Sequence, residues 1–232
     1  MDYPVLILCG GLGTRLRSVV ADRPKVLALV DNRPFLARLL DRMIAEGHQD
    51  FVLCAGYLAE QIEAFAQSYG HAGIRVIREP EPLGTGGALR FAVQQLHVRG
   101  RFAALNGDTF FSGSVQQLMQ VSMEQGDLPA LAVTEVQQAD RYGQVVMKGN
   151  RIVRFEEKRA GLMPPIRINA GVYALQAEAF LAPNLPDSFS LERTMFPVWA
   201  EQGWLLGRFY PDAVFLDMGT PEDYARAAEV MR

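Results

Sequence analysis

The feature that most constrains the fold is a short apolar run near the amino terminus that ends in glycines. Residues 5–9 are apolar, and Gly10-Gly11-Leu12-Gly13-Thr14-Arg15-Leu16 follow directly. So short a run, bounded by glycines, is typical of a buried parallel strand that leads into a loop. Glycines let the backbone turn tightly and direct several N–H groups at one anion, and Arg15 adds forked donors suited to phosphate oxygens. We therefore predict that this loop binds a nucleoside triphosphate.

Two well-known phosphate-binding motifs do not fit this loop. A Walker loop requires Gly-Lys-Ser/Thr after its spacer, and none follows here. The dinucleotide fingerprint requires a third glycine, and counting from Gly11 and Gly13 that position is Leu16. The missing glycine argues against a nicotinamide-dependent dehydrogenase. For the loop taken alone, a tight turn without a ligand is the simpler alternative.

Length and charge fit one α/β domain, or one large domain with a small appended lobe, without a polyanionic partner. The chain has 232 residues, of which 49% are hydrophobic, and this is enough for a sizeable core. Its formal net charge is -3, so no global positive field favours nucleic acid or an anionic membrane surface. Phosphate binding must therefore come from local positive groups.

Few features point to export, metal binding or redox chemistry. An acidic residue and a proline precede an apolar run that is too short for a leader or a membrane span. Cys9 and Cys54 lie in separate apolar segments and are expected to be reduced core residues, with a disulfide as the alternative. His48, His71 and His97 share no metal-ligand spacing, and we expect each on the surface near a helix end. We expect a soluble cytoplasmic enzyme.

Apolar periodicity in the first half predicts alternating strands and helices. Helical spacing recurs over 34–46 and 58–69, and Gly47 ends the first of these helices. Short apolar runs at 51–55 and 74–77 predict strands. This alternation is typical of βαβ units and a mostly parallel sheet.

A second glycine-rich loop and a carboxylate follow. The segment Leu83-Gly84-Thr85-Gly86-Gly87 opens a helix expected to end near His97, and its glycines leave room for a flat ring or a phosphate. Close helix packing or a flexible loop would explain the same glycines. A strand at 102–105 ends in Asn106-Gly107-Asp108, at the edge where such sheets bind ligands. Asp108 alone would suit a turn cap, but beside two phosphate loops a metal role is the better interpretation.

The pattern changes in the second half, after a helix at 115–125 and a strand at 130–134. Gly149-Asn150 separates two short alternating runs, which predicts a β-hairpin. We expect this insertion to form a lid or acceptor lobe. The remaining expected elements are strands at 166–175 and 205–210, a helix at 191–202, the segment 214–220 and a final helix that begins at Pro221.

Taken in order, these motifs resemble the sugar-1-phosphate nucleotidylyltransferases over residues 5–228. The resemblance is carried by Gly-Gly-x-Gly-Thr-Arg-Leu, Pro-Lys, Leu-Gly-Thr-Gly-Gly-Ala, Asn-Gly-Asp, Phe-Glu-Glu-Lys, Asn-Ala-Gly-Val-Tyr and Asp-Met-Gly-Thr-Pro-Glu-Asp-Tyr. Segments 108–111, 140–143, 155–158 and 189–192 look most like the short guanylyltransferases that act on D-glycero-α-D-manno-heptose 1-phosphate. The chain departs from the usual pattern at Cys9, Val26 and Arg159, and none of these removes a reacting group.

The resemblance implies an α/β fold with a Rossmann-like, mostly parallel or mixed central sheet flanked by helices and a small β-hairpin acceptor lobe. It implies a single nucleotidyltransferase domain over 1–232, with a nucleotide-binding part at about 1–135 and a sugar-phosphate-binding part at about 136–232. In the implied reaction, a sugar 1-phosphate oxygen attacks the α-phosphorus of a nucleoside triphosphate and releases pyrophosphate. A phosphate monoester, with its second pKa at about 6, is already largely ionised at neutral pH. No general base is needed, which agrees with the lack of a Ser-His-Asp or Cys-His set.

The resemblance also assigns residues. The expected catalytic residues are Arg15, Lys25, Asp108 and Asp217, and the two aspartates would hold Mg²⁺, which suits oxygen ligands. The expected nucleotide-binding residues are Leu8, Gly10, Gly11, Gly13, Thr14, Arg15, Glu79, Pro82, Gly84, Thr85, Gly86 and Gly107. The expected sugar-phosphate-binding residues are Gly143, Glu157, Lys158, Asn169 and Gly171.

The expected substrates are GTP and D-glycero-α-D-manno-heptose 1-phosphate, and the products would be GDP-heptose, for a capsule or lipopolysaccharide, and pyrophosphate. Mannose 1-phosphate with GTP, or N-acetylmuramate or hexose 1-phosphate with UTP, are alternatives. A non-catalytic regulator that binds a sugar nucleotide is disfavoured, because the four charged residues of the catalytic set are all present. The expected partners are these small molecules, neither nucleic acid nor membrane, and a homodimer stays open.

Overall fold

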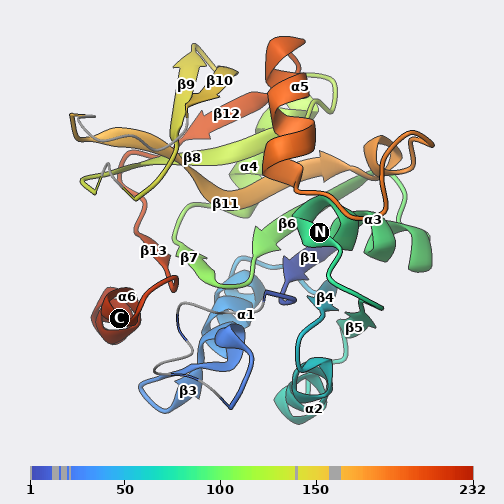
Figure 1. The fold of residues 1–232 in the computed structure, drawn as a ribbon, viewed down its shortest axis with the longest axis vertical. Coiled ribbons are helices and arrows are strands. Elements are labelled where there is room, and N and C mark those ends of the chain that lie inside the picture. The colour runs from blue at the N-terminus through green and yellow to red at the C-terminus, as the bar shows by residue number, and fades with distance from the viewer. Residues whose placement is uncertain are drawn as a thin grey trace.

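A nine-stranded mixed sheet runs through the centre of the molecule (Figure 1). The computed structural model describes residues 2–11, 16, 20, 22–138, 141–156 and 163–231. Across the sheet the strand order is β5-β4-β1-β6-β11-β8-β12-β10-β9. In chain order the strands are β1 (Val5–Leu8), β4 (Phe51–Ala55), β5 (Ile74–Arg78), β6 (Arg101–Asn106), β8 (Ala130–Val136), β9 (Gln144–Lys148), β10 (Arg151–Glu156), β11 (Ile166–Gln176) and β12 (Leu206–Phe209).

The first half of the chain builds the parallel part of the sheet, as the periodicity predicts. β1 pairs in parallel with both β4 and β6, and β4 pairs in parallel with β5. The connecting helices are α1 (Phe35–Ala45), α2 (Ala59–Tyr69) and α3 (Gly84–Gln95). The strand order reverses at β1, so the glycine loop after β1 lies at a topological switch point, where such sheets bind ligands.

The second half adds mostly antiparallel pairs. β11 lies antiparallel to β6 and β8, and the hairpin expected around Gly149-Asn150 is confirmed as β9–β10. This hairpin extends the central sheet, because Arg151 of β10 pairs with Leu206 of β12 and the Ile152 amide donates to the Leu205 carbonyl (2.9 Å). The hairpin is thereby joined to the central sheet through the first residues of β10.

Helices cover both faces of the sheet. α1, α2 and α4 (Val115–Glu124) contribute to the core on one face, and α3 and α5 (Phe196–Glu201) contribute to the core on the other. Alternation along β1 places Val5 and Ile7 in the first core and Leu6 in the second. The inner strands β1, β4 and β6 are therefore buried on both sides, which explains their continuous apolar runs.

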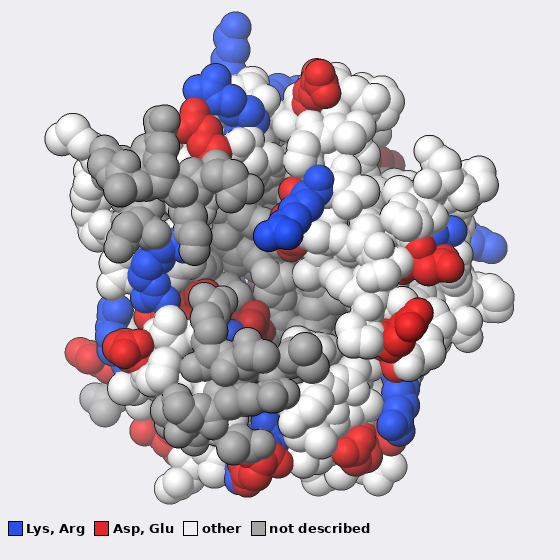
Figure 2. Space-filling model, in the orientation of Figure 1, with Lys and Arg blue, Asp and Glu red and all other residues white. Residues whose placement is uncertain are grey.

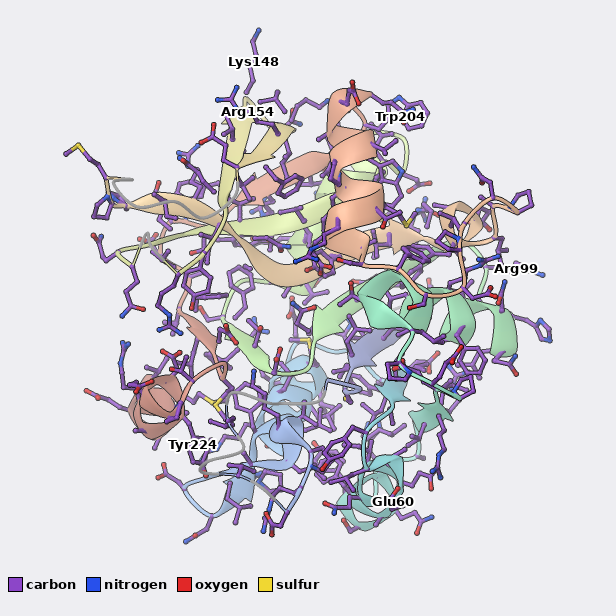
Figure 3. All side chains as sticks on the ribbon, viewed as in Figure 1. Glu60, Arg99, Lys148, Arg154, Trp204 and Tyr224 are labelled. Atoms are coloured by element: carbon purple, nitrogen blue, oxygen red, sulfur yellow. The ribbon has the colours of Figure 1, made fainter. Side chains whose placement is uncertain are left out.

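Two short sheets are absent from the sequence-based prediction. β7 (Thr109–Phe111) pairs antiparallel with β13 (Phe215–Asp217), and β2 (Leu29–Val30) pairs with β3 (Arg33–Pro34). Strands of two or three residues carry too little periodicity to be recognised. The final helix, α6 (Pro221–Val230), lies beside the β2 strand, and the hydroxyl of Tyr224, labelled in Figure 3, donates to the Leu29 carbonyl (2.7 Å).

Two further expectations need correction. His48 was expected on the surface but is buried, because Gly47, with a positive φ of 96°, turns the chain so that the imidazole packs edge-on against Tyr3. The helix expected at 191–202 is present over 191–201, but its first part, Leu191–Met195 (η4), is π-helical and only α5, with Pro197 in its first turn, is α-helical. Cys9 and Cys54 are free and buried, as expected. None of the helices within the described ranges combines the length and apolar character needed to cross a bilayer.

Candidate active site

A pocket opens at the carboxyl ends of β1 and β6, beside the first glycine loop. Its volume is about 280 Å³. It is lined by Leu8, Cys9, Gly11, Leu16, Lys25, Val26, Thr85, Asn106, Asp108 and Gly219. Figure 2 shows this side of the molecule hollowed near its middle, with acidic and basic side chains gathered in the hollow. The pocket therefore joins both glycine loops and the Asn-Gly-Asp segment.

One lysine lies between two aspartates at this pocket. The Lys25 Nζ is 2.6 Å from Asp108 Oδ2 and 3.6 Å from Asp217 Oδ1. The lysine side chain is only 11% exposed, whereas those of Asp108 and Asp217 are 39% and 23% exposed. Three of the four residues predicted to be catalytic thus form one charged cluster, and Arg15 lies outside the described residues.

The β7–β13 pairing brings the two aspartates together from distant parts of the chain. In its register Asp217 faces Thr109, and the Met218 amide donates to the Asp108 carbonyl (2.9 Å). Gly219 leaves room for the Asp217 carboxylate, because a Cβ there would lie 2.8 Å from Asp217 Oδ2 and would displace it. Lys25 reaches the same point from a short 3₁₀ helix, Lys25–Leu27 (η2), which follows Pro24.

The two aspartates fit a magnesium site that is completed by substrate. Mg²⁺ in nucleotide enzymes commonly takes one or two protein carboxylates and fills its other positions with substrate phosphates and water. The described part of the chain contains no cluster of three or more His, Cys, Asp or Glu side chains suited to a metal. Two carboxylates leave the other coordination positions to substrate and water, so the donor set of Asp108 and Asp217 fits Mg²⁺ held against a triphosphate.

The glycines of the first loop and of the Asn-Gly-Asp segment serve close packing as well as an open edge. A Cβ on Gly10 would lie 2.6 Å from Glu79 Oε1, and one on Gly107 would lie 2.5 Å from the Leu8 carbonyl oxygen. A Cβ on Gly11 would meet no atom within 4 Å, and Gly11 lines the pocket. Gly13 and Thr14, also predicted to bind nucleotide, lie outside the described residues.

Glu79 is half-buried beside the first loop and directly follows β5. Its Oε2 accepts a hydrogen bond from the Leu83 amide (3.3 Å). Burial raises the pKa of the Glu79 carboxyl above its usual value, and the Leu83 amide partly opposes this effect. Pro82 lies in the same turn, and its carbonyl accepts from the Ser188 hydroxyl (3.3 Å).

The second glycine loop is packed against the segment that precedes η4. A Cβ on Gly84 would lie 2.6 Å from the Phe189 carbonyl oxygen, and one on Gly86 would lie 2.1 Å from Phe189 Cε2. The Thr85 hydroxyl donates to Glu192 Oε2 (2.6 Å) and accepts from the Leu191 amide (2.9 Å). These glycines therefore allow close helix packing, one of the two explanations that the sequence left open.

The packing makes a stability prediction. We expect Gly86→Ala to lower the free energy of unfolding by about 1–3 kcal/mol, because the new methyl group overlaps the Phe189 ring. Urea unfolding followed by circular dichroism would measure the loss. The double variant Gly86→Ala/Phe189→Leu should recover part of it. A single variant as stable as the wild type would contradict the packing role.

Two residues predicted to contact the sugar phosphate lie together on β11. Asn169 Oδ1 accepts from the Gly171 amide (2.9 Å), where the pairing of β11 with β8 shifts register. Gly171 has a positive φ of 72°, and a Cβ on it would lie 2.9 Å from Asn106 Nδ2. Gly143 lies at the start of β9, against the Glu156 backbone. Glu157 and Lys158 fall outside the part of the chain that the structure describes.

Sequence reasoning missed some residues of this region. Asn106 lines the pocket, and Tyr173 and Glu192 lie behind it in one hydrogen-bonded cluster with Asn169. Asn106 had a usable signal, since it directly precedes Gly107 and Asp108 at the end of β6. Glu192 lies in segment 189–192, which carries part of the family resemblance, but its role could not be derived because its partners come from α3 and β11.

Comparison with known proteins agrees with the fold and the pocket. Residues 4–232 match the nucleotidyl transferase family, so this chain belongs to that family. It is 35% identical to the D-glycero-alpha-D-manno-heptose 1-phosphate guanylyltransferase of Aneurinibacillus thermoaerophilus, across 98% of this chain and 97% of that protein. It is 34% identical to the mannose-1-phosphate guanyltransferase of Aspergillus fumigatus, across 94% of this chain and 61% of that protein.

The solved structures give the same result. The crystal structure of HddC from Yersinia pseudotuberculosis complexed with GMP-PN superposes with a TM-score of 0.84. It is 32% identical in sequence, and the match covers 99% of this chain and 100% of that one. The expected α/β fold with a mixed sheet flanked by helices is therefore confirmed, and the chain is a nucleotidyltransferase.

Proposed function

We propose that this protein transfers a guanylyl group from GTP to D-glycero-α-D-manno-heptose 1-phosphate, giving GDP-heptose and pyrophosphate. The observation that carries the proposal is the convergence of Lys25, Asp108 and Asp217 at one pocket beside the first glycine loop. The full-length similarity to a heptose 1-phosphate guanylyltransferase supports the choice of sugar and base. We place nucleotide binding in residues of about 1–135 and sugar-phosphate binding in the remainder.

The charged cluster has the chemistry that this reaction requires. Two anionic substrates must meet, and negative charge on the transferred phosphoryl group must be stabilised, so positioning and electrostatics provide most of the rate enhancement. The Lys25 ammonium is held by two carboxylates and can turn toward a phosphate that enters the pocket. Asp108 and Asp217 would hold Mg²⁺, which supplies positive charge to the phosphate oxygens when bound. The attacking phosphate is already ionised, so no protein base is needed.

Glu79 is our candidate for recognition of the base. Guanine presents two neighbouring N–H donors on its Watson–Crick edge, from N1 and from the 2-amino group, and one carboxylate can accept both. Glu79 is half-buried next to Gly10, where the base of a nucleotide held by the first loop would lie. Uracil lacks the 2-amino donor, so this carboxylate favours GTP over UTP.

This assignment predicts the effect of one substitution. Glu79→Gln should lower kcat/KM for GTP by roughly 10-fold to 100-fold, because it removes a charged acceptor from two hydrogen bonds. The loss should be smaller with ITP, which lacks the 2-amino group. The exposed neighbour Glu81, changed to Gln, is the matched control. Equal losses with GTP and ITP would argue against this role.

A substrate screen tests the proposed function. Pyrophosphate release would be measured for GTP, UTP, CTP and ATP, each with heptose, mannose, glucose and N-acetylmuramate 1-phosphates, in the presence of Mg²⁺. We expect the highest kcat/KM for GTP with the heptose phosphate. Mannose 1-phosphate as the better acceptor would favour the alternative guanylyltransferase, and nucleotide binding without pyrophosphate release would favour a regulator.

We also propose that the reaction takes place in the cytoplasm and that its product serves the synthesis of a surface glycan. Both cysteines are free in the structure, which suits a reducing compartment. Fractionation of the native host, followed by immunoblotting, would test the location.

A further inference from the structure

A buried tyrosine hydroxyl lies behind the pocket at the centre of a polar cluster. Tyr173 on β11 is fully buried, its hydroxyl oxygen accepts from Asn169 Nδ2 (3.0 Å), and the Asn106 side chain lies next to the same hydroxyl. The same hydroxyl donates to Glu192 Oε1 (3.4 Å). A tyrosine hydroxyl has one donor site and two acceptor sites, so it can donate to Glu192 and accept from Asn169 and Asn106 at the same time. We call Asn106, Asn169, Tyr173 and Glu192 the Tyr173 cluster.

Glu192 fixes the direction of these hydrogen bonds. A carboxylate only accepts, and the Glu192 carboxylate also receives the hydroxyls of Thr85 (2.6 Å) and Ser190 (2.8 Å) on Oε2. The Tyr173 proton therefore points to Glu192, since a charged acceptor outcompetes a neutral amide oxygen. Burial raises the pKa of Tyr173 well above its ordinary value, so that proton is retained at working pH.

The direction of these bonds sets the orientation of Asn106. Its amide nitrogen must face Tyr173, because the only proton of that hydroxyl is committed to Glu192. Gly171 packs directly against the same amide, with no side chain between them, and helps to keep it in place. The other end of the amide, Oδ1, is buried and has no hydrogen-bond partner within the described residues.

An unsatisfied buried carbonyl oxygen is unusual and costly in a folded protein. Asn106 lines the pocket, two positions before Asp108, so a donor that completes its hydrogen bonding can come from a bound substrate. The phosphates of both substrates offer only acceptors at neutral pH. The donors that remain near the phosphates are the hydroxyl groups of the ribose and of the acceptor sugar.

We propose that Asn106 is a substrate-binding residue whose Oδ1 accepts a hydrogen bond from a sugar-ring hydroxyl, and that Tyr173 and Glu192 are positioning residues that hold its amide in the accepting orientation. The proposal rests on the function proposed above and adds a specificity contact to the same site. The Tyr173 cluster links the second glycine loop to the sugar side of the pocket, because Thr85 and Tyr173 both donate to the Glu192 carboxylate.

Deoxy substrates identify the hydroxyl. The wild-type enzyme should lose roughly 10-fold in kcat/KM with one deoxy analogue, because a site built to accept a hydroxyl is left unpaired without it. The analogues are 2′-deoxy-GTP and 3′-deoxy-GTP for the ribose, and monodeoxy sugar 1-phosphates for the acceptor. In the Asn106→Ala variant, kcat/KM for the intact substrate should fall by a similar factor. For the deoxy analogue that the wild type discriminates against, kcat/KM should fall no further. An undiminished deoxy penalty in Asn106→Ala would overturn the contact.

Tyr173→Phe tests the positioning role. It removes the hydroxyl that orients Asn106 and should raise the KM of the same substrate roughly 5-fold to 10-fold with a smaller change in kcat. Tyr210→Phe is the matched control, because Tyr210 is also buried and its hydroxyl donates to the Ser114 carbonyl (2.7 Å), in a separate contact. Glu192→Gln should also raise this KM. A glutamine amide can donate to the Tyr173 hydroxyl as well as accept from it, so the hydrogen bonds of the Tyr173 cluster can reverse direction.

The outcomes separate this inference from the proposed function. If the wild type releases pyrophosphate but Tyr173→Phe has the same KM values as Tyr210→Phe, the positioning role of Tyr173 is wrong and the proposed function stands. If no pairing of nucleotide with sugar phosphate releases pyrophosphate, the function itself fails. Thermal unfolding of all four variants would show that each is folded at the assay temperature.

Discussion

Replacing Asp108 or Asp217 by asparagine should lower turnover by roughly 10²-fold or more, a loss of about 3 kcal/mol in transition-state stabilisation. Both carboxylates form ion pairs with the Lys25 ammonium at the pocket. In the proposed reaction, charge develops there on the transferred phosphoryl group. An asparagine has nearly the same shape but lacks the charge that, in our proposal, holds Mg²⁺ against phosphate. Steady-state pyrophosphate release at saturating GTP, sugar phosphate and Mg²⁺ would measure kcat for each variant.

The control for these variants is an aspartate whose ion pair is remote from the pocket. Asp127 pairs with Arg101 at the beginning of β6, the opposite end of that strand from Asp108. Asp127→Asn should leave kcat nearly unchanged. Near-normal turnover in Asp108→Asn or Asp217→Asn at saturating Mg²⁺ would refute the metal assignment for that residue.

Lys25→Met should have two opposite effects. Turnover should fall by roughly 10²-fold to 10³-fold, because a positive charge next to the transferred phosphoryl group is lost. The affinity for Mg²⁺ in the absence of nucleotide should rise, because the two aspartates lose the ammonium that now neutralises them. Calorimetric titration with Mg²⁺, together with kcat, would measure both effects.

The matched control is Lys148→Met. Lys148 lies on the β9–β10 hairpin and points away from the molecule (Figure 3). Arg154 on the paired strand is also labelled in Figure 3, and it donates to Glu156 outside the pocket. If Lys25→Met loses turnover and Mg²⁺ affinity together, the lysine does not compete with the metal for the aspartates.

Much of the parallel half of the sheet could be predicted from the sequence, because its signals are local. The apolar run of β1, the helical spacing of α1 and the turn glycine Gly47 each lie within a few residues of the structure that they specify. The end of β6 gave Asp108 its correct place at the ligand edge of the sheet, because parallel strands share that edge. These local signals predict a ligand site at the edge of the sheet where the parallel strands end.

The meeting of Asp108 and Asp217 could not be derived from periodicity. It depends on the β7–β13 pairing, two strands of three residues that lie more than a hundred positions apart in the sequence. The family resemblance alone had linked these residues. The packing of Gly86 against Phe189 and the bond from Tyr173 to Glu192 are likewise long-range contacts, so the sequence could not decide which role the second loop's glycines have.

The central claim is that Asp108, Asp217 and Lys25 form one site for a divalent cation and the nucleotide phosphates. An anomalous difference map of crystals grown with Mn²⁺ and a non-hydrolysable GTP analogue tests it directly. We expect one manganese peak at about 2.0–2.3 Å from a carboxylate oxygen of each aspartate, with phosphate oxygens completing its coordination beside the lysine. A nucleotide bound with its metal away from both aspartates would contradict the account.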